Sequence, residues 1–242
     1  MANFSRPITH HSDPQLRVPS IDFDFNEMLP MIDGRVDLCN ITDAHSLAEA
    51  LRNTIVDCKS IGLSAPQIGI RRRVIAVGNP HDRASIIVAF NPVITDESGD
   101  LVRYEEGCLS FPGLFLRLSR HAIIRVRYTT EVGVTDTIKL SGLTARAFLH
   151  EIDHLNGVLF VDRAGSCELT RARSKQKQLL RRMKAMAKRQ PVPPMPKILA
   201  TGGTASSAPN LAADGQSTVG RNTNGPAVSW KPEYDTSMAI SQ

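Results

Sequence analysis

Hydrophobic residues recur with the period of an α-helix between residues 42 and 60. Spacings of 4, 4 and 3 residues place them on one helix face. Thr42 precedes the run and can cap the free N–H groups of the first turn. The pattern predicts an amphipathic helix that ends before Gly62. Its apolar positions are Leu47, Leu51, Ile55 and Cys58.

Two further helices are predicted towards the C-terminal end. One runs from about Thr144, a suitable N-cap, to Leu155, where Asn156 and Gly157 favour a stop. The other covers residues 168–189 and has few apolar side chains, which is typical of a solvated helix on the surface of a core.

Short β-rich runs lie between the first two helices, at residues 74–77, 86–90 and 123–128. In the third run, apolar residues alternate with arginines, as expected of a strand with one drier face. From Pro191 onward the chain is rich in Gly, Ser, Thr, Asn, Ala and Pro without periodicity. This composition predicts a disordered tail over residues 191–242, because too little apolar surface is available to offset the entropy of ordering.

Charge is unevenly distributed along the chain. The 29 Lys and Arg residues against 24 Asp and Glu give a net charge of +5. Residues 168–189 contain nine Lys or Arg residues and one acid, Glu168, whereas residues 1–167 contain 17 basic and 20 acidic residues, a net of −3. The division predicted is a folded main domain over 1–167, a basic helix over 168–190 and the tail. An acidic partner, if present, would meet the basic helix.

Several classes of protein are excluded by composition. No apolar run of about 18 residues is present, so no membrane-spanning segment is predicted. The first residues lack the basic-then-apolar layout of a secretory signal. The cysteines are far apart without a CxxC pair, which argues against a disulfide framework and a zinc ribbon, and favours a reducing, cytoplasmic location. Cys39, Cys58 and Cys167 are interpreted as small buried apolar residues.

The strongest chemical signal is the run from His150 to His154, which reads His-Glu-Ile-Asp-His. Positions i and i+4 share one helix face, so both imidazoles can reach one metal, with Glu151 beside it to move protons. The pattern also arises by chance on ordinary helices. A metzincin would need histidine at position 160, which is Phe160, and a thermolysin-like site would need Glu168, which is better explained as a first-turn acid.

A second signal lies upstream, where Cys108 stands in the sequence Glu-Glu-Gly-Cys-Leu-Ser-Phe-Pro. A cysteine in such a loop is a soft ligand for iron or zinc. Three ordered segments, residues 60–67, 106–110 and 150–154, together resemble the motifs of the peptide deformylase family. Residues 12–17 resemble its N-terminal segment, and the resemblance covers roughly residues 5–165. Leu149 departs from the family, which commonly has glutamine there.

The resemblance implies an α+β fold in which short, mostly antiparallel strands surround a central metal-bearing helix. It also implies that Glu151 is the general base and then the general acid. Gln67 and the N–H of Leu109 would donate to the developing oxyanion. The implied metal is Fe²⁺, for which Zn²⁺, Ni²⁺ or Co²⁺ can substitute. The implied metal ligands are Cys108, His150 and His154, and the implied substrate-binding residues are Gly62, Leu63 and Gly107.

The implied activity is removal of the N-formyl group from nascent formylmethionyl polypeptides, with release of formate. An apolar pocket near the metal helix would take the methionine side chain. The implied partner is the ribosome, met through residues 168–189, with no DNA or membrane contact and a monomeric state. Two other functions remain open: a metalloprotease, and a nucleic-acid-binding module with a structural metal. Asp153 is expected either to orient a histidine or to pair with Arg120.

Overall fold

The computed structural model describes residues 5–26 and 41–187. Within these residues, one antiparallel sheet has the order β1-β2-β3-β4-β5, so each strand pairs with its neighbour in the sequence. Together with its helices, this sheet confirms an α+β fold with mostly antiparallel strands. The strands are β1 (Gly62–Ser64), β2 (Val74–Val77), β3 (Ile87–Gly107), β4 (Phe115–Thr129) and β5 (Thr135–Ser141).

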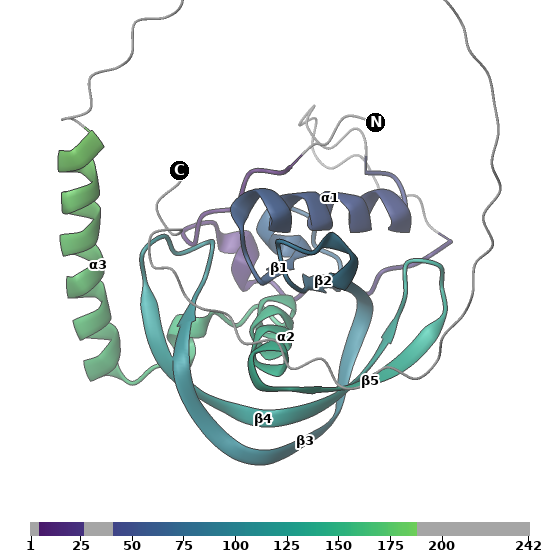
Figure 1. The fold of residues 1–242 in the computed structure, drawn as a ribbon. Coiled ribbons are helices and arrows are strands. Elements are labelled where there is room, and N and C mark those ends of the chain that lie inside the picture. The colour runs from purple at the N-terminus through teal and green to yellow at the C-terminus, as the bar shows by residue number, and fades with distance from the viewer. Residues whose placement is uncertain (1–4, 27–40, 188–242) are drawn as a thin grey trace, which may run out of the picture.

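The prediction of short strands is wrong for β3 and β4, which contain 21 and 15 residues. Both extend well beyond the apolar runs seen in the sequence, because the outer half of β3 is largely exposed and therefore polar. The pairing of β3 with β4 shifts register at three places, including the stretch from Ser98 to Leu101. Such irregularities bend a strand and increase its twist, and Figure 1 shows the hairpin curving beneath the rest of the molecule.

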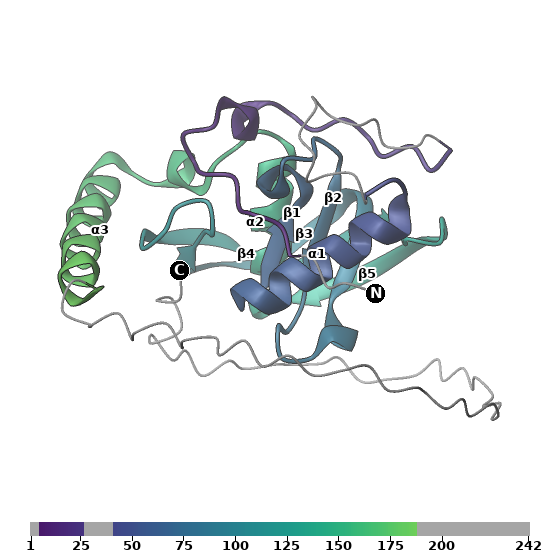
Figure 2. The same ribbon diagram turned by 90° about the horizontal axis from the view of Figure 1, so that it is seen from above.

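Three α-helices are arranged around this sheet (Figure 1). Helix α2 lies inside the curve of the sheet, α1 lies beyond β1 and β2, and α3 stands apart at one side. The view from above keeps α3 at the edge of the molecule (Figure 2). The bounds are α1 (Ala44–Cys58), α2 (Gly142–Leu155) and α3 (Ser166–Ala187).

The helix starts differ from those predicted. Asp43, not Thr42, caps α1, because its side chain accepts a hydrogen bond from the N–H of Ser46 at 2.8 Å. Helix α2 begins two residues before Thr144, since the chain turns directly from β5 into the helix. Asn156 follows its last residue, as predicted.

In the described part of the chain, the helices pack against the strands and loops in three hydrophobic clusters. Leu51 and Ile55 of α1 pack in the first cluster, with residues of β1, β2 and the start of β3. Phe148 and Ile152 of α2 pack in the second, with residues of β2, β4 and β5; Leu149, which departs from the family pattern, is buried in this cluster. The third cluster joins the turn after β3 to Ala172 of α3.

Helix α3 is attached to the body by a few defined contacts in its first half. Glu168 accepts a hydrogen bond from the backbone N–H of Arg117 at 2.7 Å and pairs with Arg103. Gln176 donates to the carbonyl of Pro112 at 2.8 Å. Glu168 is a first-turn acid, as predicted.

The predictions for the cysteines, the C-terminal residues and membrane-spanning segments have different outcomes. Cys167 is exposed, so its interpretation as a buried residue is wrong; it lies at the start of the polar helix α3. Cys58 is half-buried. Cys39, Lys188, Arg189 and the predicted tail lie outside the described residues. None of the helices in the described ranges has the length and apolar character needed to cross a bilayer.

Candidate metal centre

Helix α2 carries two histidines and a glutamate into the interior. His150 and His154 are separated by one helical turn, so both rings project from the same face, with their centroids 5.1 Å apart. His150, Glu151 and His154 are all buried. The helix therefore places two imidazoles and a carboxylate at one point inside the curve of the sheet.

Cys108 reaches the same point from the end of β3. It directly follows Gly107, and its Sγ lies 3.3 Å from Nε2 of His154. The ligand atoms of Cys108, His150 and His154 all lie within 4.8 Å of one another. The two chemical signals of the sequence, 42 residues apart, are thus brought together in space.

The charges around these three residues favour a cation. Burial lowers the pKa of His150, but the Cys108 sulfur and the Glu106 carboxylate outweigh burial and raise it well above its usual value. Burial and the proximity of His150 lower the pKa of His154, so this ring is neutral, the form in which histidine binds metals. A sulfur and two nitrogens are ligands suited to zinc or iron.

Two buried polar atoms at this site have no hydrogen-bond partner among the described residues. They are Oε2 of Glu151 and Nδ1 of His154. Burial raises the pKa of Glu151 to about 7, although neighbouring His150 opposes the shift. An unpartnered carboxylate oxygen next to three metal-type ligands fits a site that holds a metal and a water molecule.

Glu106 orients His150, a role that sequence reasoning missed. Its Oε2 lies 3.1 Å from Nδ1 of His150, and its carboxylate also accepts hydrogen bonds from Arg120 and Arg146. Burial would raise the pKa of Glu106, but the bonds from His150 and Arg120 lower it to about 2. The signals in the sequence were its position two residues before Cys108 and its place at the start of the 106–110 segment.

Asp153 belongs to the same network of charges. It accepts hydrogen bonds from Arg120 at 2.8 Å and from Arg163. Of the two expected roles, pairing with Arg120 is therefore the one observed. Arg120 joins Glu106 to Asp153 and so fixes β3 against α2 beside the site.

Gln67 points its amide N–H₂ group at the metal ligands. Its Oε1 accepts hydrogen bonds from the N–H and the hydroxyl of Ser64, both at 2.9 Å. Its Nε2 then lies 3.5 Å from Sγ of Cys108 and 3.3 Å from the hydroxyl oxygen of Ser110. Ser64 thus fixes which end of the amide faces the centre.

The remaining predicted residues line the surroundings of this centre. Gly62 and Leu63 belong to β1, which ends the sheet and pairs only with β2 among the described strands. A Cβ on Gly62 would lie 2.6 Å from Oε1 of Glu151, so a larger residue would displace the carboxylate. Gly107 ends β3, and half-buried Leu109 follows Cys108.

The N-terminal segment connects the two loops at the centre, which sequence reasoning also missed. The N–H of Thr9 donates to the carbonyl of Gln67 at 2.7 Å, and the N–H of His11 donates to the carbonyl of Ser110 at 3.0 Å. The ring of His11 stacks on Phe111 with centroids 4.4 Å apart. These contacts hold the loop of Gln67 and the loop of Ser110 in one arrangement.

A helix with two histidines and a glutamate, completed by a cysteine just after a strand end, is an arrangement typical of metal-dependent hydrolases. The sequence model of the Polypeptide deformylase family matches residues 6–170. The chain belongs to this family.

Similar proteins agree with this assignment. The peptide deformylase of Prochlorococcus marinus subsp. pastoris (strain CCMP1986 / NIES-2087 / MED4) is 45% identical over 125 residues, 51% of this chain and 62% of the relative, so the match spans less than two thirds of that protein. The peptide deformylase of Synechococcus sp. (strain CC9605) is 37% identical over 65% of this chain and 77% of its own length.

Solved structures are similar over most of the described chain. The peptide deformylase from Legionella pneumophila has a TM-score of 0.62 and 30% identity, covering 78% of this chain and all of that one. The enzyme from Synechococcus elongatus in complex with actinonin has a TM-score of 0.59 and 33% identity, covering 73% of this chain and 91% of that one.

Proposed function

We propose that this protein is a peptide deformylase that hydrolyses the N-formyl group of N-terminal formylmethionine in nascent polypeptides and releases formate. The observation that carries the proposal is the convergence of Cys108, His150 and His154 beside the buried carboxylate of Glu151, whose Oε2 has no hydrogen-bond partner among the described residues. Membership of the polypeptide deformylase family supports it.

Cys108, His150 and His154 would hold the metal, with α2 as the central metal-bearing helix. We expect Fe²⁺, for which Zn²⁺, Ni²⁺ or Co²⁺ can substitute. When bound, such a metal would act as a Lewis acid and would lower the pKa of a bound water molecule to about 7. Glu106 would keep the ring of His150 oriented, because its Oε2 lies 3.1 Å from Nδ1.

Glu151 would take a proton from the attacking water and pass it to the nitrogen of the leaving peptide. A general base works best when its pKa is near the working pH, and burial raises the pKa of this carboxyl to about 7. Gly62 leaves the space in which the carboxylate lies.

The oxyanion would be stabilised by Nε2 of Gln67 and the backbone N–H of Leu109. The bonds from Ser64 fix the Gln67 amide before substrate arrives. A donor held in this way contributes about 3–4 kcal/mol to the transition state. The outer edge of β1, at Gly62 and Leu63, and the end of β3 at Gly107 would pair with the substrate backbone.

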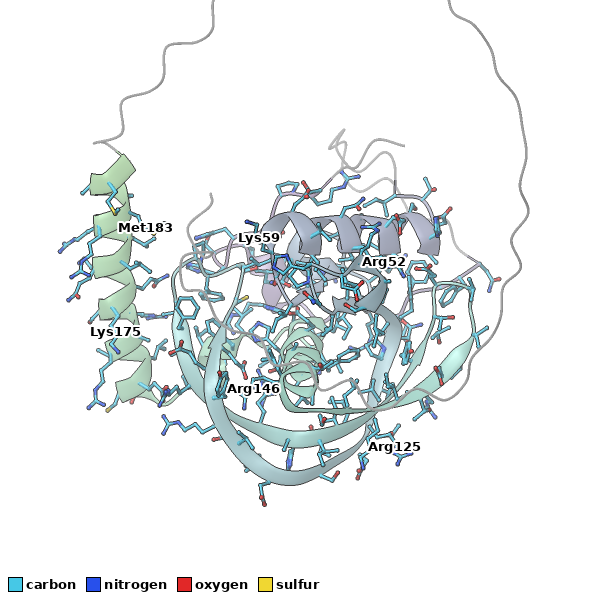
Figure 3. All side chains as sticks on the ribbon, in the orientation of Figure 1. Arg52, Lys59, Arg125, Arg146, Lys175 and Met183 are labelled. Atoms are coloured by element: carbon cyan, nitrogen blue, oxygen red, sulfur yellow. The ribbon has the colours of Figure 1, made fainter. Side chains whose placement is uncertain are left out.

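The basic helix α3 would bind ribosomal RNA and protein, close to the nascent substrates. We also expect the enzyme to be cytoplasmic and monomeric. Seven of its basic residues are described, and all seven are exposed. Figure 3 shows nitrogen-tipped side chains projecting from the side of α3 that faces away from the body, with Lys175 among the labelled residues. We expect co-sedimentation with ribosomes at low salt to be lost when residues 168–242 are deleted.

The hydrolytic function is tested by formate release from formyl-Met-Ala-Ser under anaerobic conditions with Fe²⁺-loaded protein. We expect Glu151→Gln to lower the rate about 10²- to 10⁴-fold, the usual contribution of a general base. Glu105→Gln is the matched control, because Glu105 is exposed on the opposite face of β3 from Glu106. Cleavage of peptide bonds in the unformylated peptide would instead indicate a metalloprotease.

A further inference from the structure

A column of aromatic rings runs from the N-terminal segment to the candidate metal ligand His150. The ring of His11 stacks on that of Phe111, with centroids 4.4 Å apart and planes inclined by 12°. Phe111 meets Phe160 edge to face at 5.2 Å, and Phe160 lies against the ring of His150 at 5.6 Å. Both phenylalanines are buried. The inner part of the column therefore belongs to the core beside the metal centre.

Phe111 is the last residue of the turn that presents Cys108 and Leu109. We call residues 108–111 the cysteine turn. The N–H of Phe111 donates to the carbonyl of Cys108 at 2.9 Å, which closes a four-residue turn. The candidate sulfur ligand and the N–H expected to face the oxyanion both belong to it. Because the turn is short and hydrogen-bonded, a shift of the Phe111 ring would move both groups.

His11 contacts the cysteine turn at two points. Its backbone N–H donates to the carbonyl of Ser110 at 3.0 Å, and its ring covers Phe111. Two residues earlier, the N–H of Thr9 donates to the carbonyl of Gln67 at 2.7 Å. The cysteine turn and the loop of Gln67 carry the two expected oxyanion donors, and this one segment is bonded to both.

The ring of His11 is suited to packing. Burial, together with nearby His10 and Arg173, lowers the pKa of His11, so its imidazole is neutral at pH 7. A neutral imidazole stacked on a phenyl ring is an ordinary aromatic pair. A phenylalanine at position 11 could therefore make the same contact with Phe111.

We propose that His11 is a positioning residue, whose ring holds Phe111 and thereby fixes the sulfur of Cys108 and the N–H of Leu109 in the arrangement that metal binding and oxyanion stabilisation need. Its part in catalysis rests on the proposed function, whereas its part in holding the sulfur ligand does not. A donor stabilises the transition state most when it is fixed before the reaction. Loss of the His11 ring should therefore lower kcat and leave KM nearly unchanged.

Formate release from formyl-Met-Ala-Ser tests the catalytic part. In His11→Ala, kcat should fall about fivefold to tenfold, because an aromatic pair is lost, while KM changes by less than about twofold. His11→Phe keeps a ring on Phe111 and should restore kcat to within about twofold of wild type. The backbone N–H of residue 11 remains in both variants, so their difference reports the ring alone. The midpoint of thermal unfolding shows that each variant is folded.

Release of metal tests the same role without the reaction. Co²⁺-loaded protein is mixed with excess EDTA, and the loss of the visible Co²⁺ absorption is followed. His11→Ala should release Co²⁺ about fivefold faster than wild type, because the sulfur of Cys108 is held less firmly. This effect is smaller than the 10- to 100-fold loss of metal affinity that is typical when a direct partner of a ligand is removed. His11→Phe should release Co²⁺ at nearly the wild-type rate.

His10→Ala is the matched control. His10 is exposed, and its ring lies at the outer end of the column, with its centroid 4.1 Å from that of His11. This variant alters the same segment but leaves the ring of His11 on Phe111. It should keep both kcat and the rate of Co²⁺ release within about twofold of wild type.

Three results would each overturn the inference. They are an unchanged kcat or an unchanged rate of Co²⁺ release in His11→Ala, a lack of recovery in folded His11→Phe, and equal losses in His10→Ala. Absence of formate release by the wild-type protein would instead contradict the proposed function. The rates of Co²⁺ release would still decide whether His11 holds the sulfur ligand in place.

Discussion

Two arginine-rich regions of this molecule differ in what surrounds the charge. Inside the curve of the sheet, Arg120 and Arg146 donate to Glu106, and Arg120 also pairs with Asp153. On α3, the described basic residues are exposed, and none forms an ion pair with an acid within the described ranges. Buried arginines hold the candidate metal site in place, whereas exposed ones leave their charge free for a partner.

Because of this difference, the buried arginines should contribute mainly to the stability of the fold and the exposed ones mainly to binding of a partner. A buried charge has lost its hydration, so its removal leaves the opposite charge unpaired and is strongly destabilising. An exposed charge keeps its hydration, and its removal changes the fold little. Variants in the two regions should therefore affect different measurements.

The largest effect is expected from Arg120→Met in the buried region. Its loss would leave Glu106 and Asp153 without a shared partner and should lower the free energy of unfolding by about 3–5 kcal/mol. The control is Arg125→Met on the same strand, which is exposed and lies on the outer side of the sheet (Figure 3). It should change stability by about 0.5 kcal/mol or less. Equal effects in urea unfolding would contradict the comparison.

The buried network should also make stability depend on pH. The pKa of Glu106 is about 2 in the folded protein, below the 4.5 of an unperturbed glutamate, so ionised Glu106 stabilises the fold above about pH 4.5. This contribution, about 3 kcal/mol at 1.36 kcal/mol per pKa unit, is lost as the pH falls from 4.5 towards 2.

Urea unfolding between pH 6 and pH 2 measures this contribution, with metal removed from both proteins. The free energy of unfolding of the wild type should fall more steeply than that of Glu106→Gln, which has no carboxyl to protonate. Parallel curves for the two proteins would show that Glu106 is not held ionised by its partners.

The candidate metal ligands could be predicted from the sequence because each belongs to a short local motif. His150 and His154 share a helix face by virtue of a four-residue interval, and Cys108 stands within a short motif. Arg146 and Glu106, in contrast, are 40 residues apart, and only the folding of α2 onto β3 brings them together. No local pattern records such a contact.

The same distinction explains the errors in the fold. The short β-rich run at residues 74–77 located β2 to the residue, because that strand is buried throughout and therefore apolar at every position. The apolar pattern could not show the length of β3, whose outer half is exposed and is held by pairing with β4 instead of by burial. Pairing between strands joins residues that are distant in the sequence. The length over which two strands pair therefore cannot be predicted from the residues of either strand alone.

An intermediate effect, on binding alone, is expected from neutralising part of α3. Changing Arg171, Lys175, Arg181 and Arg182 to Gln should weaken binding to RNA and flatten the dependence of log K on log salt by about 3 to 4. The midpoint of thermal unfolding should stay unchanged, because all four side chains are exposed. The control Arg125→Gln with Arg127→Gln removes exposed charges from β4 and should leave the salt dependence near wild type. A similar loss in the control would locate the RNA surface on the sheet.

The smallest effect is expected at Glu168, where the two regions meet. Its carboxylate accepts a hydrogen bond from the backbone N–H of Arg117, and this bond is the main cause of its lowered pKa. Since the side chain is partly exposed, Glu168→Gln should cost about 1 kcal/mol or less in global unfolding. Hydrogen exchange should nevertheless speed up in the first turns of α3 and at the N–H of Arg117. If exchange instead stayed at the wild-type rate there, the contacts of Gln176 and Ala172 alone would hold the helix against the body, and the position of its basic side chains would not depend on Glu168.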